Sequence, residues 1–225
     1  MSNPRRLLIV GAAGLGRQML GWAMDIPASE REWDIGGFLD NRPGILDGYK
    51  RPFGIVGDPD TYRFTEDDRV ICAIADPGIR LEYARKLAAR GARFTQLIHP
   101  TAIISFNCSI GEGSALGPLA GLDCDVTIGD HVVVNGPGVV GHDTVVGNGC
   151  HLGTCMVLSG GCRLGEGVFI GANATVNENL VLGDRATVGS GSVATKHVPG
   201  GMAVMGVPAR PIKELARARR SGRPR

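Results

Sequence analysis

The sequence predicts two parts: a small parallel α/β domain over residues 1–97 and a parallel β-helix over residues 98–206. Two observations carry this prediction. Strand-like and helix-like runs alternate in the first part, which is typical of a parallel sheet covered by helices. An uninterrupted repeat of period six fills the second part, as in proteins built from stacked coils. Residues 207–225 follow as a basic tail.

The repeat places a branched aliphatic residue at every sixth position from Ile98 to Val188, and Ala194 ends the series. Glycine often comes directly after the aliphatic residue, and a second, usually small residue comes four positions after it. Neither an amphipathic helix, with a period of about 3.6, nor a strand, with a period of about 2, gives this pattern. Short strands joined by bends do, with one large and one small side chain turned inward on each flat face. Stacked coils of this kind, about 4.8 Å apart, bury one continuous core.

This repeat resembles that of the hexapeptide acyltransferases. The resemblance implies a left-handed β-helix with three hexapeptides, or eighteen residues, in each coil. Residues eighteen positions apart in the sequence should then be neighbours on adjacent coils.

The composition limits the classes of function. The formal net charge is +2, but residues 210–225 carry seven Lys or Arg against one Glu, so the rest of the chain is slightly acidic. An acidic body without interleaved aromatic residues argues against nucleic-acid binding, and the tail is expected to be solvated. No apolar run reaches the roughly 18 residues of a membrane span, and no signal peptide is recognisable. We therefore expect a cytoplasmic protein without a membrane partner.

The six cysteines are expected to be reduced and mostly structural. Cys108, Cys150 and Cys162 fall at the small inward position of the repeat, where a thiol packs as a compact apolar group. No CxxC pair exists, so the spacing favours neither zinc binding nor a disulfide framework. No metal site is expected.

The first part begins with a strand at residues 6–10, a glycine turn from Gly11 to Gly16 and a helix at 17–24. Such a turn lets backbone N–H groups approach a phosphate at the start of the helix. Further strands are expected at 33–39, 69–75 and 94–98, and a second helix at 79–90. Asp40 ends the second strand, where nucleotide-binding folds often hold a ribose hydroxyl. We expect a Rossmann-like nucleotide domain, too short for a complete dehydrogenase cofactor domain.

The sequence neighbourhood separates two histidines, His142 and His151, from the other three, which are expected to be surface or structural. His142 follows the inward Val140 by two positions, so its imidazole should point out of the coil. Gly160 lies eighteen residues further on, which places its backbone N–H beside that imidazole. A general base next to a free N–H group is an arrangement suited to acyl transfer, with the N–H as an oxyanion donor.

Motifs spread over most of the chain resemble the bacterial sugar acetyltransferases of the sialic-acid O-acetyltransferase type, from about residue 6 to residue 211. That family includes the N-acetyltransferases that act on nucleotide-linked amino sugars. The motifs are the glycine turn, His99-Pro100, Asn135, His142-Asp143, His151, Ser159-Gly160-Gly161 and residues 206–210.

The resemblance implies roles for individual residues. His142 would be the general base, Asp143 would raise its basicity, and His151, Ala172 and Ser190 would contact acetyl-CoA. It also implies a homotrimer with CoA held between subunits. The expected substrate-binding residues are Gly11, Ala13, Gly14, Leu15, Asp40, Asn41, Arg42 and Asn135.

We therefore expect an acetyl-CoA-dependent enzyme that acetylates the amine of a nucleotide-linked amino sugar, for surface polysaccharide or glycan biosynthesis. Ala13 and Leu15 depart from the family, which often has Ser or Gly and then His there. Two alternatives stay open: O-acetylation of a sugar such as a sialic acid, and a non-catalytic β-helix that acts as a scaffold or nucleotide-binding regulator. No residue decides between N- and O-acetylation or names the nucleotide.

Overall fold

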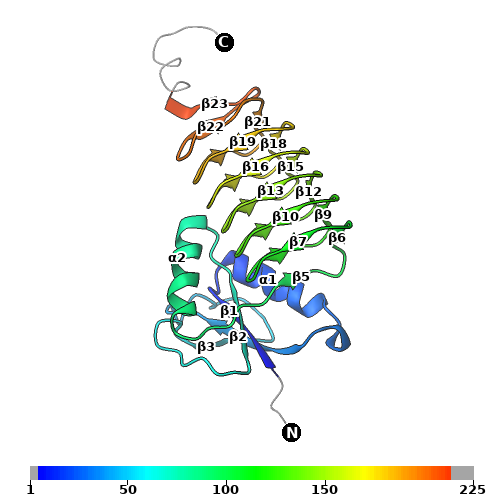
Figure 1. The fold of residues 1–225 in the computed structure, drawn as a ribbon. Coiled ribbons are helices and arrows are strands. Elements are labelled where there is room, and N and C mark those ends of the chain that lie inside the picture. Colours follow the sequence, from blue (N-terminus) through cyan, green and yellow to red (C-terminus); the bar gives the residue numbers. More distant parts are fainter. Residues whose placement is uncertain (1–4, 214–225) are drawn as a thin grey trace.

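The computed structural model describes residues 5–213, and it has two stacked parts (Figure 1). A sheet with two helices forms the base, and a three-sided prism of stacked coils rises from it, so that the described chain ends at the far end of the prism. No helix among residues 5–213 is long and apolar enough to cross a membrane.

The base is a four-stranded parallel sheet in the order β3-β2-β1-β4. Its elements are β1 (Arg5–Val10), α1 (Gly14–Asp25), a short 3₁₀ helix (Ala28–Glu30), β2 (Trp33–Leu39), β3 (Ile55–Gly57), β4 (Asp68–Cys72) and α2 (Pro77–Ala88). The first two predicted strands and both helices are confirmed. The strand β3 was not predicted, because only three residues form it.

Two predicted strands of the base differ from those in the structure. The third strand stops at Cys72 and not at residue 75, because the chain turns there toward Asp76, whose side chain accepts the N–H of Ile79 at the start of α2. The predicted strand at 94–98 does not join the sheet as a strand. Phe94 makes only a single bridge to the sheet, and β5 (Leu97–Ile98) instead pairs with the prism.

The prism has three flat faces, each a sheet of stacked strands that pair in parallel except at β23, and we call them faces I, II and III. Face I contains β5, β8 (Ala115–Leu116), β11 (Val133–Val134), β14 (His151–Leu152), β17 (Phe169–Ile170), β20 (Thr187–Val188), β22 (Ala203–Met205) and β23 (Arg210–Pro211). Face II contains β6 (Ile103–Ile104), β9 (Ala120–Leu122), β12 (Gly138–Val140), β15 (Val157–Leu158), β18 (Thr175–Val176) and β21 (Val193–Ala194). Face III contains β7 (Ser109–Ile110), β10 (Thr127–Ile128), β13 (Val145–Val146), β16 (Arg163–Leu164) and β19 (Val181–Leu182).

Strand pairing has the register that the repeat predicts. His151 pairs with Phe169, and Val139 pairs with Val157, so neighbours on adjacent coils are eighteen residues apart. The inward aliphatic residues form one continuous core, and the small positions that accompany them, such as Thr144, are also fully buried. The exceptions lie in the first coil, where Ile104 is 39% exposed and Ile98, Cys108 and Ile110 are partly buried.

The prism extends further than the predicted boundary at residue 206. The strand β23 pairs antiparallel with β22, so residues 207–211 fold back onto the last coil and are not part of a free tail. The remainder of the predicted basic tail, from residue 214, lies outside the described residues.

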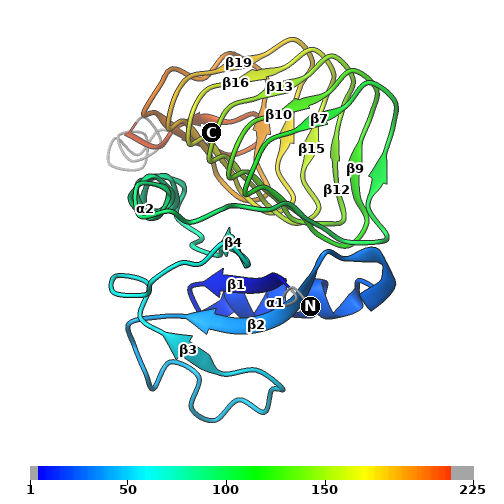
Figure 2. The same ribbon diagram turned by 60° about the horizontal axis from the view of Figure 1, so that its bottom comes forward.

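The two parts are packed closely together. Helix α1 lies under the prism, with the Trp22 ring against Gly117, and Ala115 and Val133 of face I belong to the apolar core of the base. Helix α2 stands beside the prism (Figures 1 and 2). This packing therefore determines which end and which edge of the prism lie next to the sheet of the base.

Candidate active site

His142 and Asp143 form a hydrogen-bonded pair at the corner between faces II and III. The Nδ1 atom of His142 lies 2.7 Å from Oδ2 of Asp143. The left-handed backbone of Asp143, with φ of 57°, belongs to the tight bend that holds the two side chains together. The hydrogen bond to Asp143, and then the charges of Asp143, Asp123 and Asp125, raise the pKa of His142. With the Nδ1 proton donated to the carboxylate, the neutral ring keeps an unprotonated Nε2 that can accept a proton.

Gly160 is the neighbour of His142 on the next coil, as predicted. A Cβ atom at residue 160 would lie 2.6 Å from Nε2 of His142, so the imidazole lies directly over a position that only glycine leaves open. The Gly161 N–H donates to the carbonyl of His142 at 2.8 Å and fixes the backbone between the coils.

The N–H of Gly160 has no hydrogen-bond partner within residues 5–213. At another corner of the prism, the corresponding N–H groups of Glu112, Asp130 and Glu166 each donate to the Asp or Asn side chain one coil on, at 2.8–2.9 Å. The residue one coil on from Gly160 is Glu178, and within the described residues its side chain accepts no hydrogen bond from the Gly160 N–H. A donor is therefore left free beside a base.

His151 and Asn135 form a second pair, on and next to face I. The Nε2 atom of His151 lies 3.1 Å from the Asn135 side-chain nitrogen, which also donates to the carbonyl of Leu152. Because an amide nitrogen can only donate, Nε2 accepts and the proton of the neutral ring is on Nδ1. The Nδ1 atom is buried and has no partner among the described residues. Burial, and then the charge of Arg80, lowers the pKa of His151 to about 4, so the ring is neutral near pH 7.

Phe169 stacks on the His151 ring, with 5.2 Å between ring centroids and 12° between planes. Its role was not predicted, although the register could have indicated it, because Phe169 is the residue eighteen positions after His151. The stacked ring fixes the direction of the free Nδ1–H donor.

Ala172 and Ser190 lie on neighbouring coils at the corner between faces I and II, and both are exposed. The Gly191 N–H donates to the carbonyl of Ala172 at 2.9 Å, and a Cβ atom at Gly171 would lie 2.4 Å from the backbone nitrogen of Ser190. The predicted stacking is confirmed. Asn135 lies at the same corner, further toward the base.

The predicted residues thus fall into two groups on different edges of one prism. His142, Asp143 and Gly160 lie between faces II and III, whereas Asn135, Ala172 and Ser190 lie between faces I and II. Face II separates the two groups.

A third group lies at the carboxyl ends of the strands in the base. A cavity of about 230 Å³ there is lined by Val10, Gly11, Leu39, Asp40, Asn41, Arg42, Pro59, Ile74 and Tyr83. The structure therefore brings four of the predicted substrate residues together. Ala13, Gly14 and Leu15 lie just outside this lining, at the start of α1, whose first turn has no side-chain cap.

Both carboxylate oxygens of Asp40 accept hydrogen bonds from within the protein. Its Oδ1 accepts the backbone N–H and Nε–H of Arg42, and its Oδ2 accepts the N–H of Ala12 and Nη2 of Arg42. A carboxylate has about four acceptor positions, so all are filled. Burial tends to raise the pKa of Asp40, but the hydrogen bonds from Arg42 and Ala12 outweigh it and lower the pKa. Asp40 therefore braces the glycine turn and orients Arg42.

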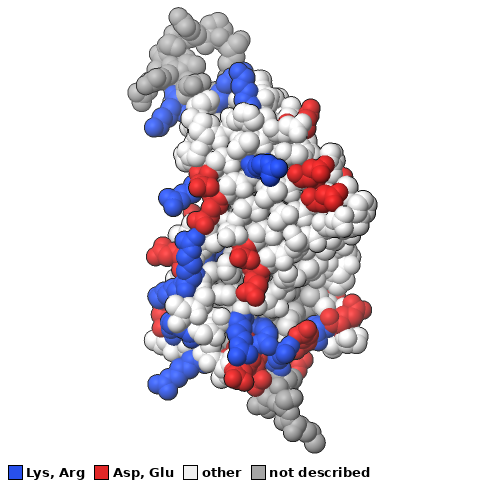
Figure 3. Space-filling model, in the orientation of Figure 1, with Lys and Arg blue, Asp and Glu red and all other residues white. Residues whose placement is uncertain are grey.

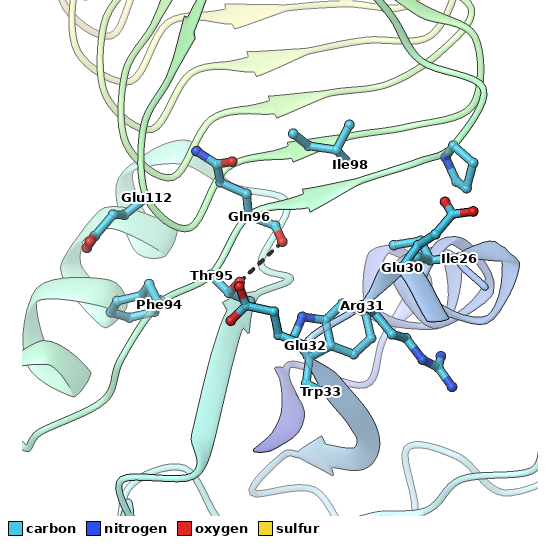
Figure 4. A pocket seen from close by; sticks show the side chains of 11 residues that line it. Ile26, Glu30, Arg31, Glu32, Trp33, Phe94, Thr95, Gln96, Ile98 and Glu112 are labelled. Atoms are coloured by element: carbon cyan, nitrogen blue, oxygen red, sulfur yellow. Dashed lines mark hydrogen bonds between the residues drawn. The ribbon is translucent and has the colours of Figure 1, made fainter. Parts of the chain in front are cut away.

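A larger cavity, of about 470 Å³, lies at the opposite, amino end of the strands (Figure 4). Trp33, Phe94, Gln96 and Glu112 are among its lining residues, and none of the predicted site residues reaches it. Within residues 5–213, no group of three or more His, Cys, Asp or Glu side chains could hold a metal ion. All six cysteines are free.

The remaining histidines make contacts within the protein. His99 lies 2.9 Å from the Thr101 hydroxyl and 3.1 Å from the Asp25 carboxylate, across the junction between the base and the prism. His131 packs edge-on against Phe94, and Nδ1 of His197 accepts the N–H of Val181.

Comparison with known proteins agrees with this geometry. Residues 6–87 match the PglD N-terminal domain family, and residues 161–196 match the bacterial transferase hexapeptide family. The acetyltransferase domain of PglB from Neisseria gonorrhoeae, solved with acetyl coenzyme A, is 30% identical with a TM-score of 0.83, over 93% of this chain and 100% of that chain.

The chain belongs to the hexapeptide-repeat sugar acetyltransferases, whose β-helix is left-handed. PerB from Caulobacter crescentus, solved with CoA and GDP-perosamine, is 29% identical with a TM-score of 0.80, over 91% of this chain and 96% of that chain. WeeI from Acinetobacter baumannii is 25% identical with a TM-score of 0.78, over 92% of this chain and 99% of that chain. No curated protein sequence matches this chain significantly.

On the face of this acetyltransferase seen in Figure 3, acidic and basic side chains are mixed, and a broad area of the prism carries no charge. Such a surface contrasts with the continuous basic stripe that is typical of nucleic-acid-binding proteins.

Proposed function

We propose that this protein transfers the acetyl group of acetyl-CoA to the amine of a nucleotide-linked amino sugar. The observation that carries the proposal is the His142–Asp143 pair, whose free Nε2 lies over Gly160 with its unpaired N–H. Acetyl-CoA is bound by PglB and GDP-perosamine by PerB, and both proteins resemble this chain over more than nine-tenths of its length. These likenesses support the two substrate classes.

The proposed chemistry uses His142 as general base. Its Nε2 accepts a proton as the amine nitrogen attacks the thioester carbon, and it returns that proton to the CoA sulfur when the carbon–sulfur bond breaks. Asp143 stabilises the imidazolium that forms between these two steps. The N–H of Gly160 lies where it could stabilise the negative charge that develops on the thioester oxygen.

His151 has a different part in this proposal. Its ring is neutral, its direction is set by Asn135 and Phe169, and its buried Nδ1–H has no partner in the described chain. A buried donor without a partner costs free energy until a ligand satisfies it. We assign it to acetyl-CoA, with Ala172 and Ser190 further along the same side of the prism.

The nucleotide is assigned to the cavity at the carboxyl ends of the strands in the base. Gly11 there has φ of 95° and a backbone that bends sharply before α1, so N–H groups at the uncapped helix start can meet a phosphate. Arg42, oriented by Asp40, has a half-exposed guanidinium group at the same cavity. Ala13 and Leu15 offer no polar side chain there, so backbone groups, Asn41 and Arg42 would hold the nucleotide.

A homotrimer would complete the site, because the two groups of residues on the prism lie on different edges. Face II between them carries an exposed apolar row in which Ile103, Val139 and Val157 are 69%, 50% and 45% exposed. Packing face II against a second copy would cover this row. A closed ring of three copies would also place the His142 edge of one chain beside the Ser190 edge of the next.

The six free cysteines suit a reducing compartment, and we assign the protein to the cytoplasm, where acetyl-CoA is available.

The test of the proposed function is an assay of CoA release with acetyl-CoA and a panel of UDP-, GDP- and dTDP-linked 4-amino sugars. The matched controls are the same nucleotide sugars with a hydroxyl group in place of the amine. Mass spectrometry of the product should show an amide on one amino sugar. CoA release only with hydroxyl acceptors would indicate O-acetylation. Absence of CoA release with every acceptor would indicate a non-catalytic protein.

A further inference from the structure

Arg80 of helix α2 is completely buried between the base and the prism. Its guanidinium group donates to five backbone carbonyls: from Nε to His131 at 2.9 Å, from Nη1 to Ile74 at 2.6 Å and Ala75 at 3.2 Å, and from Nη2 to Gly149 at 2.6 Å and Cys150 at 3.1 Å. A guanidinium group has five N–H donors, so the five bonds can use all of them. No carboxylate among the described residues forms a salt bridge with Arg80.

Four of the five carbonyls belong to two places that the proposed reaction must hold in register. Ile74 lines the nucleotide cavity, and so does Tyr83, which lies about one turn after Arg80 on α2. Gly149 and Cys150 directly precede His151, whose free Nδ1–H is assigned to acetyl-CoA. One rigid side chain therefore joins the wall of the nucleotide cavity to the strand that carries His151.

The surrounding packing makes this connection direct. Leu81, the next residue of α2, lies against Gly149, where a Cβ atom would come within 2.3 Å of the Leu81 Cγ. His131, the third anchor, stands one coil before Gly149, so Arg80 holds two successive coils. The burial of Arg80 lowers its pKa to about 10, and the group still carries its charge near pH 7.

We propose that Arg80 is a positioning residue that sets the nucleotide cavity relative to the acetyl site, so that the sugar amine of a bound nucleotide sugar reaches the thioester. This inference rests on the proposed function. A displacement of about 1 Å can reduce turnover by about 10²-fold when reacting groups must meet in a fixed geometry. The contacts of α1 beneath the prism hold the two parts together without fixing α2 against residues 149–151.

The test uses Arg80→Lys, which keeps the positive charge but has three donors in place of the planar fork. The matched control is Arg85→Lys on the same helix, where an exposed arginine pairs with Glu166 at 2.8 Å. Each variant is assayed with the nucleotide-linked amino sugar and with the same amino sugar free, which does not use the nucleotide cavity.

Arg80→Lys should lower kcat/KM for the nucleotide-linked acceptor at least tenfold, and change the KM for acetyl-CoA and kcat/KM for the free sugar less than twofold. Arg85→Lys should change all three less than twofold. An equal loss with both acceptors, or no loss with either, would overturn the proposal, since a merely structural residue does not distinguish the acceptors.

Two measurements keep the inference testable in other circumstances. If Arg80→Lys does not fold, Gly149→Ala takes its place. The added methyl group would push Leu81, and with it α2, away from residue 149 while Arg80 is unchanged. This variant should show the same selective loss of kcat/KM for the nucleotide-linked acceptor. Amide hydrogen exchange needs no turnover: in Arg80→Lys, exchange should rise together at residues 73–76 and 149–152, and a rise at only one of them would contradict the coupling. Failure of the wild-type protein to acetylate any nucleotide sugar would instead count against the proposed function, while the exchange result would still decide the role of Arg80.

Discussion

A side chain on Gly160 would collide with the imidazole of His142, because its Cβ would lie 2.6 Å from Nε2. The two residues are eighteen positions apart and belong to adjacent coils, so the period of the repeat itself places a free N–H beside the base.

The first prediction follows from this contact. Gly160→Ala should displace the imidazole and lower kcat by at least tenfold, with the melting temperature little changed because the corner is exposed. Gly21→Ala, where a Cβ would meet nothing within 4 Å, is the matched control and should keep full activity. Equal activity of the two variants would remove Gly160 from the site.

Asp143→Asn should lower activity less than loss of His142 and should move the pH profile. The hydrogen bond and charge of Asp143 raise the pKa of His142. Catalysis by a general base needs the neutral ring, so activity rises as pH increases through this pKa. Without the carboxylate the pKa falls, and the acid limb of the kcat profile should shift to lower pH, with a lower plateau because the base is weaker. A shift to higher pH, or none, would contradict the role of Asp143.

Asp40→Ala should lower the stability of the protein. It removes a carboxylate that accepts four hydrogen bonds, and a hydrogen bond to a charged group contributes about 1.5–3 kcal/mol. We expect a loss of about 1–3 kcal/mol in the free energy of unfolding at pH 7. The lowered pKa of Asp40 means that this contribution is present above the unfolded-state pKa of about 3.9 and is lost as pH falls through the folded-state pKa. The wild-type and variant stabilities, measured by denaturant unfolding, should therefore converge at low pH. A constant difference down to pH 2 would contradict this assignment.

Mixed trimers test whether the active site lies between chains. In the proposed trimer, His142 of one chain serves the acetyl-CoA edge of another. His142→Asn and Ser190→Trp, which would block the CoA edge, should each be nearly inactive as homotrimers. Co-refolded mixtures should regain activity, because some interfaces then combine two intact edges. Light scattering should show three chains per particle throughout. A monomer with full activity, or mixtures without recovery, would contradict the shared site.

Most of what could be predicted about the prism came from the six-residue repeat. Its period fixed the inward residues and the pairs at eighteen residues, including His142 with Gly160 and Ala172 with Ser190. The glycines that follow the aliphatic residues are needed for close contact between coils as well as for bending. A Cβ at Gly141, for example, would lie 2.6 Å from the backbone nitrogen of Gly160, so a larger residue does not fit there. The left-handed backbone falls two positions later, at residues such as Asp143.

The base was less predictable, because its site depends on contacts between distant segments. Asp40 stands at the end of β2, where a ribose ligand is common, but the sequence does not show that Arg42 and Ala12 fill its acceptors. Arg80 had no signal at all, since an arginine in an amphipathic helix is usually solvated. Its burial depends on how α2 docks beside Gly149, and no local pattern encodes that arrangement.

The central claim is that His142 is the general base, and the most direct measurement is turnover by His142→Asn at saturating acetyl-CoA and amino-sugar acceptor. The variant should fold, form the same oligomer and bind acetyl-CoA as the wild type does, because the side chain is exposed and its corner is held by backbone hydrogen bonds. Loss of a general base typically costs about 10²–10⁴-fold, so kcat should fall by that factor with little change in either KM. A folded His142→Asn protein that keeps more than about a tenth of wild-type kcat would contradict the account.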